Sequence, residues 1–351
     1  MDYPLIVNGQ IVGGGSIAQR LLRNNMDQNT LRTWVGKDGR AYMNVNGKGV
    51  PITHGNATLR KDEWKDLDAA VLKLSQERLV GVQDLISRGL TYNIPNGMGK
   101  TILEYEDQGD FTAAQLDMDA VTRGKGDRPI YSLKGLPLPI IHKEFQVTAR
   151  ALAASRNGST PLDTSGAEMA TRMVAEKQED LLFTGSSSFA FGSYTLYGYV
   201  DAPDRNTVTL TQNWDASGKT GAEIITDVLA MKQASINAKH YGPWVIYIPT
   251  AYETVLDNDY DTTTPGTTIR ERILKIAGIE DIKVVDKLAA NTVLLVQMTA
   301  DVVRWVTGMP ITTTDWTEQG GSLLNFKVMT ISVPQIRADK DGNSGITHLA
   351  A

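Results

Sequence analysis

Cysteine is absent from the 351 residues of the chain. Its absence excludes disulfides, cysteine-ligated zinc, iron–sulfur clusters and thiol catalysis. Histidine is scarce, and the four histidines are scattered without a metal-binding pair at helical spacing: His54, His142, His240 and His348. The stability of the protein must therefore come from packing within the chain or from assembly with other chains.

Long apolar runs and an excess of basic residues are also missing. No run approaches the roughly 20 residues that a membrane-spanning helix needs, and the first residues do not form a signal peptide, so we expect no membrane partner. The net charge of −5 does not indicate a nucleic-acid-binding surface. The hydrophobic content of 41% is enough for a core, and the length predicts two domains or one domain with large extensions.

Three stretches resemble ligand-binding motifs, and each fails at a defined position. "GMGKT" at 97–101 has Ile94 where a phosphate-binding loop needs glycine. "DNDYD" at 257–261 has Thr262 and Thr268 where a calcium-binding loop needs glycine and glutamate, and "DKDGNSG" fails in the same way. No pair of carboxylates stands out for acid–base chemistry. The sequence therefore predicts no catalytic residue, no cofactor and no metal, and we expect a protein that is not an enzyme.

A long helix is predicted at residues 166–183, within "TSGAEMATRMVAEKQEDLLFTG". Ser165 and Glu168 have the spacing of a capping box, and Gly185 can end the helix in the left-handed conformation. Six residues follow helical spacing and predict the buried stripe: Met169, Ala170, Met173, Val174, Leu181 and Leu182. Because no side chain of this helix suggests catalysis, we expect it to have a mechanical role.

Strands and helices alternate after residue 206, and the fold class predicted for the chain is α+β. "WVIYIP", "IKVVD", "TVLLVQM" and "VVRWV" read as strands, and "LNFKVMTISVPQIRAD" as a long strand near the C-terminus. Helices are predicted after Thr220 and Thr250, each with a glutamate three residues later, and at "TIRERILKIAG", which Gly278 ends. A helix is also predicted over 61–90, with Trp64 on its apolar face.

The first 60 residues read as an arm, since their parts are too small to bury a core alone. They comprise a hairpin turning at Asn8-Gly9, a short helix in "SIAQRLLRNN" and a hairpin around Asp38-Gly39.

Two predicted strands, "TILEYE" and "PIYSLKG", flank a long charged excursion. Its first half is acidic and its second half basic, with these charged residues: Asp107, Asp110, Asp117, Asp119, Arg123, Lys125 and Arg128. Long loops of this kind are usually functional. These residues are candidates for ion pairs with a neighbouring subunit, and a solvated loop of mixed charge is the alternative. Exposed ion pairs contribute only about 0–1 kcal/mol each, so the charges alone do not decide between the two.

Three blocks of the chain resemble the major capsid proteins of tailed bacteriophages, which have the Hong Kong 97-type fold shared with encapsulins. The first is "LRKDEWKDLDAAVLKLSQERLVG". The second runs from "LKGLPLPIIHKEF" to "EKQEDLLFTG", where Glu176, Glu179 and Asp180 precede the "LFTG" of residues 182–185 as acids do in that family. The third runs from "TVLLVQM" to "VPQIRAD", so the resemblance covers about residues 60–340.

This resemblance implies a Hong Kong 97-like capsid fold with an N-arm, an extended E-loop hairpin, a P-domain and an α/β A-domain. The implied segments are the N-terminal arm at 1–60, a lead-in helix at 61–91, the E-loop at 92–145, the P-domain with its spine helix at 146–205, the A-domain at 206–300, and the closing A-domain strands and last P-domain strand at 301–351.

The resemblance also implies partners and a location. The chain would assemble with itself as pentamers and hexamers, contact neighbouring capsomers and enclose double-stranded DNA by containment, without sequence-specific binding. We expect a separate scaffold and a portal as partners, and leave open whether a decoration protein binds. The particle would be a virion, assembled in the cytoplasm of a bacterial host. Two alternatives remain: the shell of an encapsulin nanocompartment, and an α/β enzyme of unknown substrate.

Overall fold

The structure is a computed structural model that describes residues 80–108, 131–157, 164–261 and 266–350, single residues at 116, 118 and 128, and short strands within residues 6–51. The chain divides into two units. The smaller unit comprises residues 1–60, 147–162 and 317–324, and the larger unit comprises 61–146, 163–316 and 325–351. The predicted helix in "SIAQRLLRNN" and residues 61–79 of the predicted helix at 61–90 lie outside the described residues.

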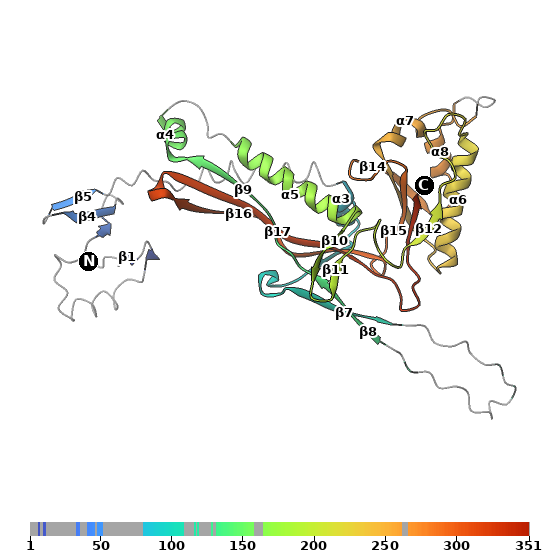
Figure 1. The fold of residues 1–351 in the computed structure, drawn as a ribbon, viewed down its shortest axis with the longest axis horizontal. Coiled ribbons are helices and arrows are strands. Elements are labelled where there is room, and N and C mark those ends of the chain that lie inside the picture. The colour runs from blue at the N-terminus through green and yellow to red at the C-terminus, as the bar shows by residue number, and fades with distance from the viewer. Residues whose placement is uncertain are drawn as a thin grey trace. The chain divides into compact units, whose positions relative to one another are not determined.

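A five-stranded mixed sheet forms one part of the larger unit (Figure 1). Its strands lie in the order β12 (Asn206–Thr209), β18 (Ile346–Ala350), β15 (Thr292–Gln297), β13 (Trp244–Pro249) and β14 (Ile279–Val285). β12 runs parallel to β18 and β13 parallel to β14, whereas β15 is antiparallel to both of its neighbours. Three helices belong to this region: α6 (Gly221–Asn237), α7 (Glu253–Leu256) and α8 (Ile269–Leu274).

Strand β13 is buried along its whole length, as its unbroken apolar sequence predicts. Because successive side chains of a strand point to opposite faces, the strand contributes to two cores. Trp244, Ile246 and Ile248 pack in a core with α6 and α8. Val245 and Tyr247 pack in a second core with residues of α3 (Val80–Ser87) and of the long helix α5.

A second sheet has the strand order β6 (Thr91–Asn93), β16 (Val303–Glu318), β17 (Leu323–Ile336) and β9 (Ile141–Thr148). Helix α5 (Ser165–Phe183) packs on it through Ala170, Val174 and Leu181, which share a core with Val328 and Val333 of β17. The predicted strands are confirmed. β16 continues well beyond "VVRWV", since it forms a long pair with β17.

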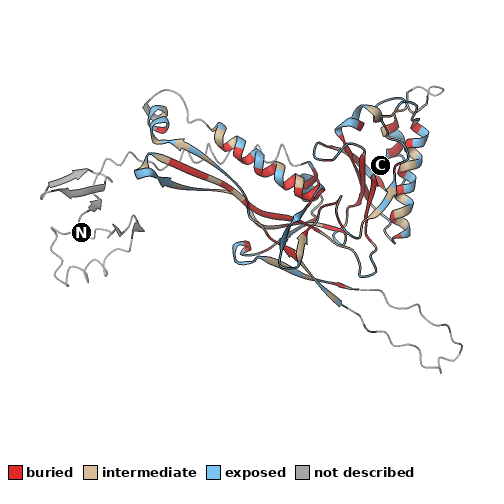
Figure 2. Cartoon of the chain, viewed as in Figure 1, coloured by how far each residue is buried: buried red, intermediate tan, exposed pale blue. Residues whose placement is uncertain are grey.

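Helix α5 is present where the sequence predicts it, and Gly185 ends it in the left-handed conformation with φ 72°. Two details of the prediction are wrong. Thr164 is the N-cap in place of Ser165, and no side chain caps the helix because Thr164 has near-helical dihedral angles. Met169 and Met173 are exposed by 67% and 42%, so they do not belong to the buried stripe. Figure 2 shows that α5 has both buried and exposed positions. Small residues such as Ala167 and Ala170 are buried there and let the helix approach the sheet closely.

Helix starts and hairpins were predicted with mixed success. The capping box of Thr220 and Glu223 is confirmed. Thr250 does not cap a helix, since it opens the short 3-10 helix η3 (Thr250–Tyr252) and Tyr252 is the N-cap of α7. The predicted strand from "GLPLP" onward is two strands, because β8 (Tyr131–Pro137) ends before β9 begins. β8 pairs with β7 (Ile102–Gln108), and β10 (Ser186–Phe191) with β11 (Tyr194–Leu196).

The smaller unit contains both hairpins predicted for the arm. β1 (Ile6–Val7) pairs with β2 (Gln10–Ile11), and β3 (Thr33–Val35) pairs with β4 (Ala41–Val45). β4 also pairs with β5 (Lys48–Pro51), a strand that the sequence analysis missed. Helix α4 (Ala149–Asn157) begins in this unit beside the turn that joins β16 to β17, where the Ala149 amide donates to the Ser322 carbonyl at 2.9 Å.

The contact between α3 and α5 depends on a missing side chain. A Cβ atom on Gly81 would lie 2.6 Å from the Phe183 ring and 2.9 Å from Leu182. Both of those side chains are fully buried and have no room to move. We expect Gly81→Ala to lower the free energy of unfolding by about 1–2 kcal/mol through overpacking, although alanine favours the helix. The measurement is urea unfolding followed by tryptophan fluorescence.

The control for this substitution is Gln83→Ala, on the exposed side of the same helix. It should change the unfolding free energy by less than about 0.5 kcal/mol. Equal stabilities of the two variants would contradict the close packing of α3 on α5.

Candidate functional site: the charged hairpin and the α3 junction

The structure describes two of the seven charged candidates of the predicted excursion. Asp107 lies in β7 and is 3% exposed, and Arg128 is exposed. Asp110, Asp117, Asp119, Arg123 and Lys125 lie outside the described residues. The described residues therefore do not test the seven candidates as a set, and the intersubunit role of the set stays a prediction.

The carboxylate of Asp107 has a partner within its own chain. Lys134 of β8 lies with its Nζ 2.7 Å from Asp107 Oδ2 and 3.6 Å from Asp204 Oδ2. Partial burial works against the positive charge of Lys134, but the hydrogen bond to Asp107 and the negative charges of Asp107 and Asp204 together exceed this effect and raise the lysine pKa. The same surroundings raise the pKa of Tyr105, first through burial and then through the charge of Asp107. Asp107 and Lys134 thus tie the two strands together, and Asp204 extends this contact to the segment before β12.

The opposite face of the β7–β8 hairpin is exposed. Glu104 and Glu106 of β7 are exposed on this face. From β8, the Tyr131 side chain is 55% exposed and the Leu133 side chain is 58% exposed. Beyond the strands, Leu116 and Met118 are almost completely exposed. Several large apolar side chains exposed on one projecting element are typical of a protein–protein contact surface.

The motifs that fail as ligand sites have structural roles instead. Gly97–Gly99 forms the 3-10 turn η2 and leads into strand β7, with no helix after it to hold a phosphate. Asp257 accepts a hydrogen bond from Arg270 at 2.9 Å, and Asp339 accepts from Asn343 within its own turn. Among the described residues, no group of three or more histidine or acidic side chains could hold a metal ion.

A second polar arrangement, missed in the sequence, lies around the short helix α3. Glu179 of α5 is only 5% exposed and points its carboxylate at the first turn of α3. The Gly81 amide donates to Glu179 Oε1 at 2.8 Å, and the Val82 amide lies 3.5 Å from Oε2. A carboxylate is favoured at a helix N-terminus, where amides lack intrahelical partners. Burial nevertheless raises the pKa of Glu179 to about 7, against the lowering effect of these two hydrogen bonds.

The other side of α3 is held to the five-stranded sheet by Asp84, which is 3% exposed. Its carboxylate accepts from the Tyr247 hydroxyl of β13 at 2.8 Å and from Arg88 Nε at 3.0 Å, and Lys283 Nζ of β14 lies 3.0 Å away. Arg88 also pairs with Glu280 of β14. Burial alone would raise the pKa of Asp84, but the hydrogen bonds from Tyr247, Arg88 and Lys283 reverse the effect and lower it.

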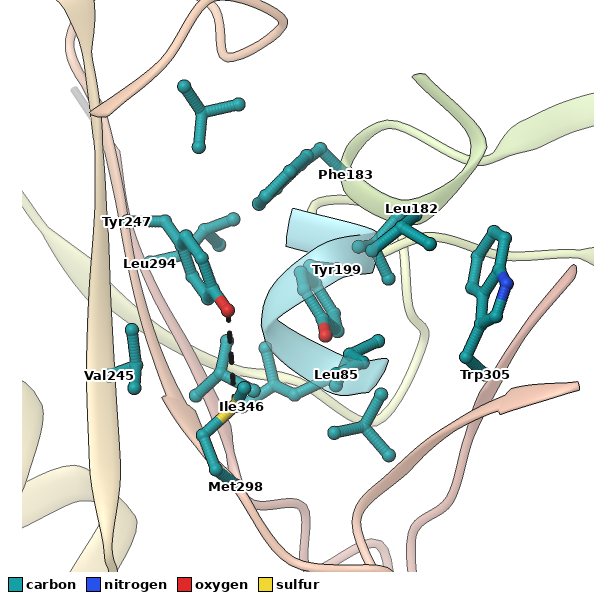
Figure 3. Packing of buried hydrophobic residues seen from close by; sticks show 14 of the residues in the cluster. Leu85, Leu182, Phe183, Tyr199, Val245, Tyr247, Leu294, Met298, Trp305 and Ile346 are labelled. Atoms are coloured by element: carbon teal, nitrogen blue, oxygen red, sulfur yellow. Dashed lines mark hydrogen bonds between the residues drawn. The ribbon is translucent and has the colours of Figure 1, made fainter. Parts of the chain in front are cut away.

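Aromatic and aliphatic side chains pack around α3 in one buried cluster (Figure 3). The ring of Phe183 meets those of Tyr199 and Tyr247 edge-on, with centroids 5.6 and 5.1 Å apart. Leu85 of α3 and Leu294 of β15 belong to the same core. We call α3 with Glu179, Asp84 and these residues the α3 junction. It connects α5 to the five-stranded sheet through packing and hydrogen bonds, and its described residues include no nucleophile–base pair.

No local sequence signal identifies the α3 junction. Glu179 stands in an acid-rich stretch and Asp84 in the short segment "VGVQDLIS". Asp84, an acid among mostly apolar residues, indicated a buried polar contact but did not indicate which residues it contacts.

Comparison with known proteins gives one family and a set of similar folds. Residues 54–349 match the model of a family of unknown function, DUF6260. The type 1 encapsulin shell protein EncA of Myxococcus xanthus is 24% identical over 215 residues, which are 60% of this chain and 68% of that protein.

Among solved structures, the virus-like particle from Pyrococcus furiosus matches with a TM-score of 0.60 and 18% identity, over 82% of this chain and 98% of that one. A chain of Mycobacterium phage Bobi matches with a TM-score of 0.54 and 13% identity, over 76% of this chain and 89% of that one. No helix in the described parts of the chain is both long and apolar enough to span a membrane.

The Asp107–Lys134 pair can be tested by removing its cation. We expect Lys134→Met to lower the free energy of unfolding by about 1–2 kcal/mol, because a buried carboxylate loses its partner. The cost is kept small because the Lys134 side chain is 39% exposed and water can reach the site. The measurement is urea unfolding, together with hydrogen exchange of the β7–β8 amides.

The double variant Asp107→Leu with Lys134→Met should recover most of this loss, because no buried charge then remains. Lys143→Met, an exposed lysine in β9, is the matched control and should have little effect. A loss that is equal in the single and double variants would show that the pair itself does not stabilise the hairpin.

Proposed function

The chain belongs to the DUF6260 family, whose function is unknown, and has the Hong Kong 97-type fold of phage capsids and encapsulin shells; we propose that it is the major capsid protein of a tailed bacteriophage. The observation that carries the proposal is the fold match, which extends over 98% of one shell-forming chain and 89% of a phage chain. The relatives are shell proteins, and the two sites described above hold elements together without offering groups for catalysis.

The domain assignment is part of this proposal. The first 60 residues would be the N-arm, and residues 61–91 the lead-in helix of the P-domain. The β7–β8 hairpin and its charged tip would be the E-loop of residues 92–145, and α5 on the β16–β17 sheet would be the spine helix of the P-domain at 146–205. The five-stranded sheet would be the core of the A-domain at 206–300, closed by strands from 301–351.

The exposed face of the hairpin supports a role in contacts between subunits. Tyr131 and Leu133 are large apolar side chains without cover in the described part of the chain. Glu104 and Glu106 beside them carry negative charge that basic groups of a neighbour could meet. Asp107 is different, since Lys134 already neutralises it within the chain.

The proposed partners are further copies of the chain, as pentamers and hexamers, and neighbouring capsomers. Many weak contacts would add up in such a shell, as linked binding events do. A scaffold and a portal would be separate proteins, and DNA would be held by containment. An acidic chain with a net charge of −5 suits that purpose, because it does not attract the phosphate backbone. The virion would assemble in the host cytoplasm.

A second candidate is the shell of an encapsulin nanocompartment. The observation in its favour is that EncA, a named relative by sequence, is an encapsulin shell protein. Nuclease-treated particles from the source organism distinguish the two candidates. Protected double-stranded DNA, with terminase and portal genes near the gene, supports the capsid, whereas a protein cargo with its gene alongside supports the nanocompartment.

Assembly is the first prediction of this proposal. The purified chain should form ring-shaped capsomers or closed shells, seen by negative-stain electron microscopy and by sedimentation. The control is the same chain in a denaturant concentration that dissociates particles, which should sediment slowly. A stable monomer of 38.3 kDa at high protein concentration would contradict both shell candidates.

The acidic half of the charged excursion between β7 and β8 gives a second prediction. We expect Asp110, Asp117 and Asp119 together changed to asparagine to weaken assembly by about 0–1 kcal/mol per lost contact, multiplied over the contacts of a particle. The critical concentration for assembly measures this, at low and at high salt, since salt should reduce the difference. Asp301→Asn, at an exposed position outside the hairpin, is the control. Unchanged assembly at both salt concentrations favours the solvated-loop alternative.

A further inference from the structure

The side chain of Glu179 links α5 to the backbone of α3. Its bonds to the Gly81 and Val82 amides span 98 and 97 residues of sequence. The packing around them is tight, because Gly81 faces the Phe183 ring without space for a Cβ atom. A change at this carboxylate therefore acts directly on how α3 sits against α5.

The charges around Glu179 do not neutralise it. Among the described residues, Glu179 forms no ion pair. Asp286, which follows β14, disfavours its ionisation, and Lys287 favours it more weakly, as the smaller of the two influences. Lys287 Nζ lies 3.9 Å from the carboxylate of Glu176, one turn earlier in α5. A negative charge on Glu179 is therefore held by two amides in a dry site.

The remaining groups at the α3 junction reinforce this situation. Tyr199 is completely buried, and Asp84 and Glu179 both act on its hydroxyl to disfavour its ionisation. The Tyr247 hydroxyl of β13 donates a hydrogen bond to Asp84. Asp84 forms ion pairs with Arg88 and Lys283 on the sheet side of α3, and these keep it charged. Glu179 has no such ion pair among the described residues, so it is the carboxyl group that titrates near neutral pH.

From this geometry we propose that Glu179 is a proton-operated latch between α5 and α3. With its proton the side chain is neutral, and α3 stays seated on α5. Without the proton, a charge is confined in the junction, and the contact opens more often because opening gives the carboxylate access to water. The latch belongs to the single chain and does not depend on the proposed shell function.

The direction of the pH effect follows from linkage. The pKa of Glu179 is about 7 in the closed junction, against the ordinary pKa of 4.5 for a glutamate carboxyl in water. The closed state thus binds the proton more tightly than the open state. The protonated carboxyl stabilises the closed state fully below pH 4.5. This stabilisation is lost as the pH rises from 4.5 to about 7, and the free energy of opening stays constant above pH 7. Within this window, the open fraction should rise up to about tenfold per pH unit, and roughly 10- to 30-fold from pH 5.5 to pH 8.

Hydrogen exchange measured by mass spectrometry on the full-length protein tests the latch. The observable is the protection of the peptide containing the Gly81 and Val82 amides, corrected for the intrinsic pH dependence of exchange. In the wild-type protein, protection should fall roughly 10- to 30-fold from pH 5.5 to pH 8. A peptide from β13 provides the internal control and should change much less.

Glu179→Gln is the main variant, because glutamine keeps the shape and an acceptor oxygen but cannot titrate. Its protection should not depend on pH. Asp286→Asn is the second variant, at an exposed position where folding is not at risk. It should move the transition of the wild-type curve to lower pH, since a neighbouring negative charge is removed. The same pH dependence in wild type and Glu179→Gln, or protection that rises with pH, would overturn the latch.

Discussion

Burial of the eight-residue helix α3 between α5 and the five-stranded sheet is the constraint on which the larger unit depends. A helix of this length is not stable alone in water, so tertiary contacts must hold it. Asp84 fixes it to β13 and β14, and Glu179 fixes its first turn to α5. Both carboxylates lie within a core of aromatic and aliphatic side chains, where an unsatisfied polar group would be costly. The hydrogen bonds of α3 therefore set the angle and register at which α5 meets the sheet.

Shared elements make the rest of this unit mechanically continuous. Helix α5 places Ala170 and Val174 in the core above β17, and Leu182 and Phe183 in the core at α3. Alternate side chains of strand β13 pack in two different cores, one with residues of α3 and the other with residues of α6. A displacement of one element must disturb two cores, because close-packed interiors transmit strain. Such continuity suits a subunit that carries load from one contact to the next.

Sequence patterns predicted what depends on short-range order. β13 is recognisable because a strand buried on both faces is apolar throughout, and the end of α5 because Gly185 can adopt a positive φ. The exposure of Met169 was not predictable from periodicity, since a helix with alanines on one side and methionines on another has two apolar faces. The burial of Asp107 depends on the pairing register that brings Lys134 beside it, and the role of Glu179 depends on a partner 98 residues away. Asp107 was named as a candidate, but neither its pairing with Lys134 nor the contact of Glu179 with α3 is encoded within a local window, so neither pairing was predicted.

The α3 junction and the β7–β8 hairpin differ in how far contacts within the chain cover their side chains, and this difference bears on the proposed assembly. At the α3 junction, each carboxylate meets donors from the same chain. On the outer face of the β7–β8 hairpin, Tyr131 and Leu133 are exposed although they have the size of core residues. A two-stranded hairpin is at best marginally stable in water when it stands alone. Within the chain, the Lys134 pair and the core contacts of Leu103, Tyr105 and Leu136 support the inner face of the hairpin. Its outer face remains exposed, and under the proposed shell function a neighbouring copy of the chain would cover it.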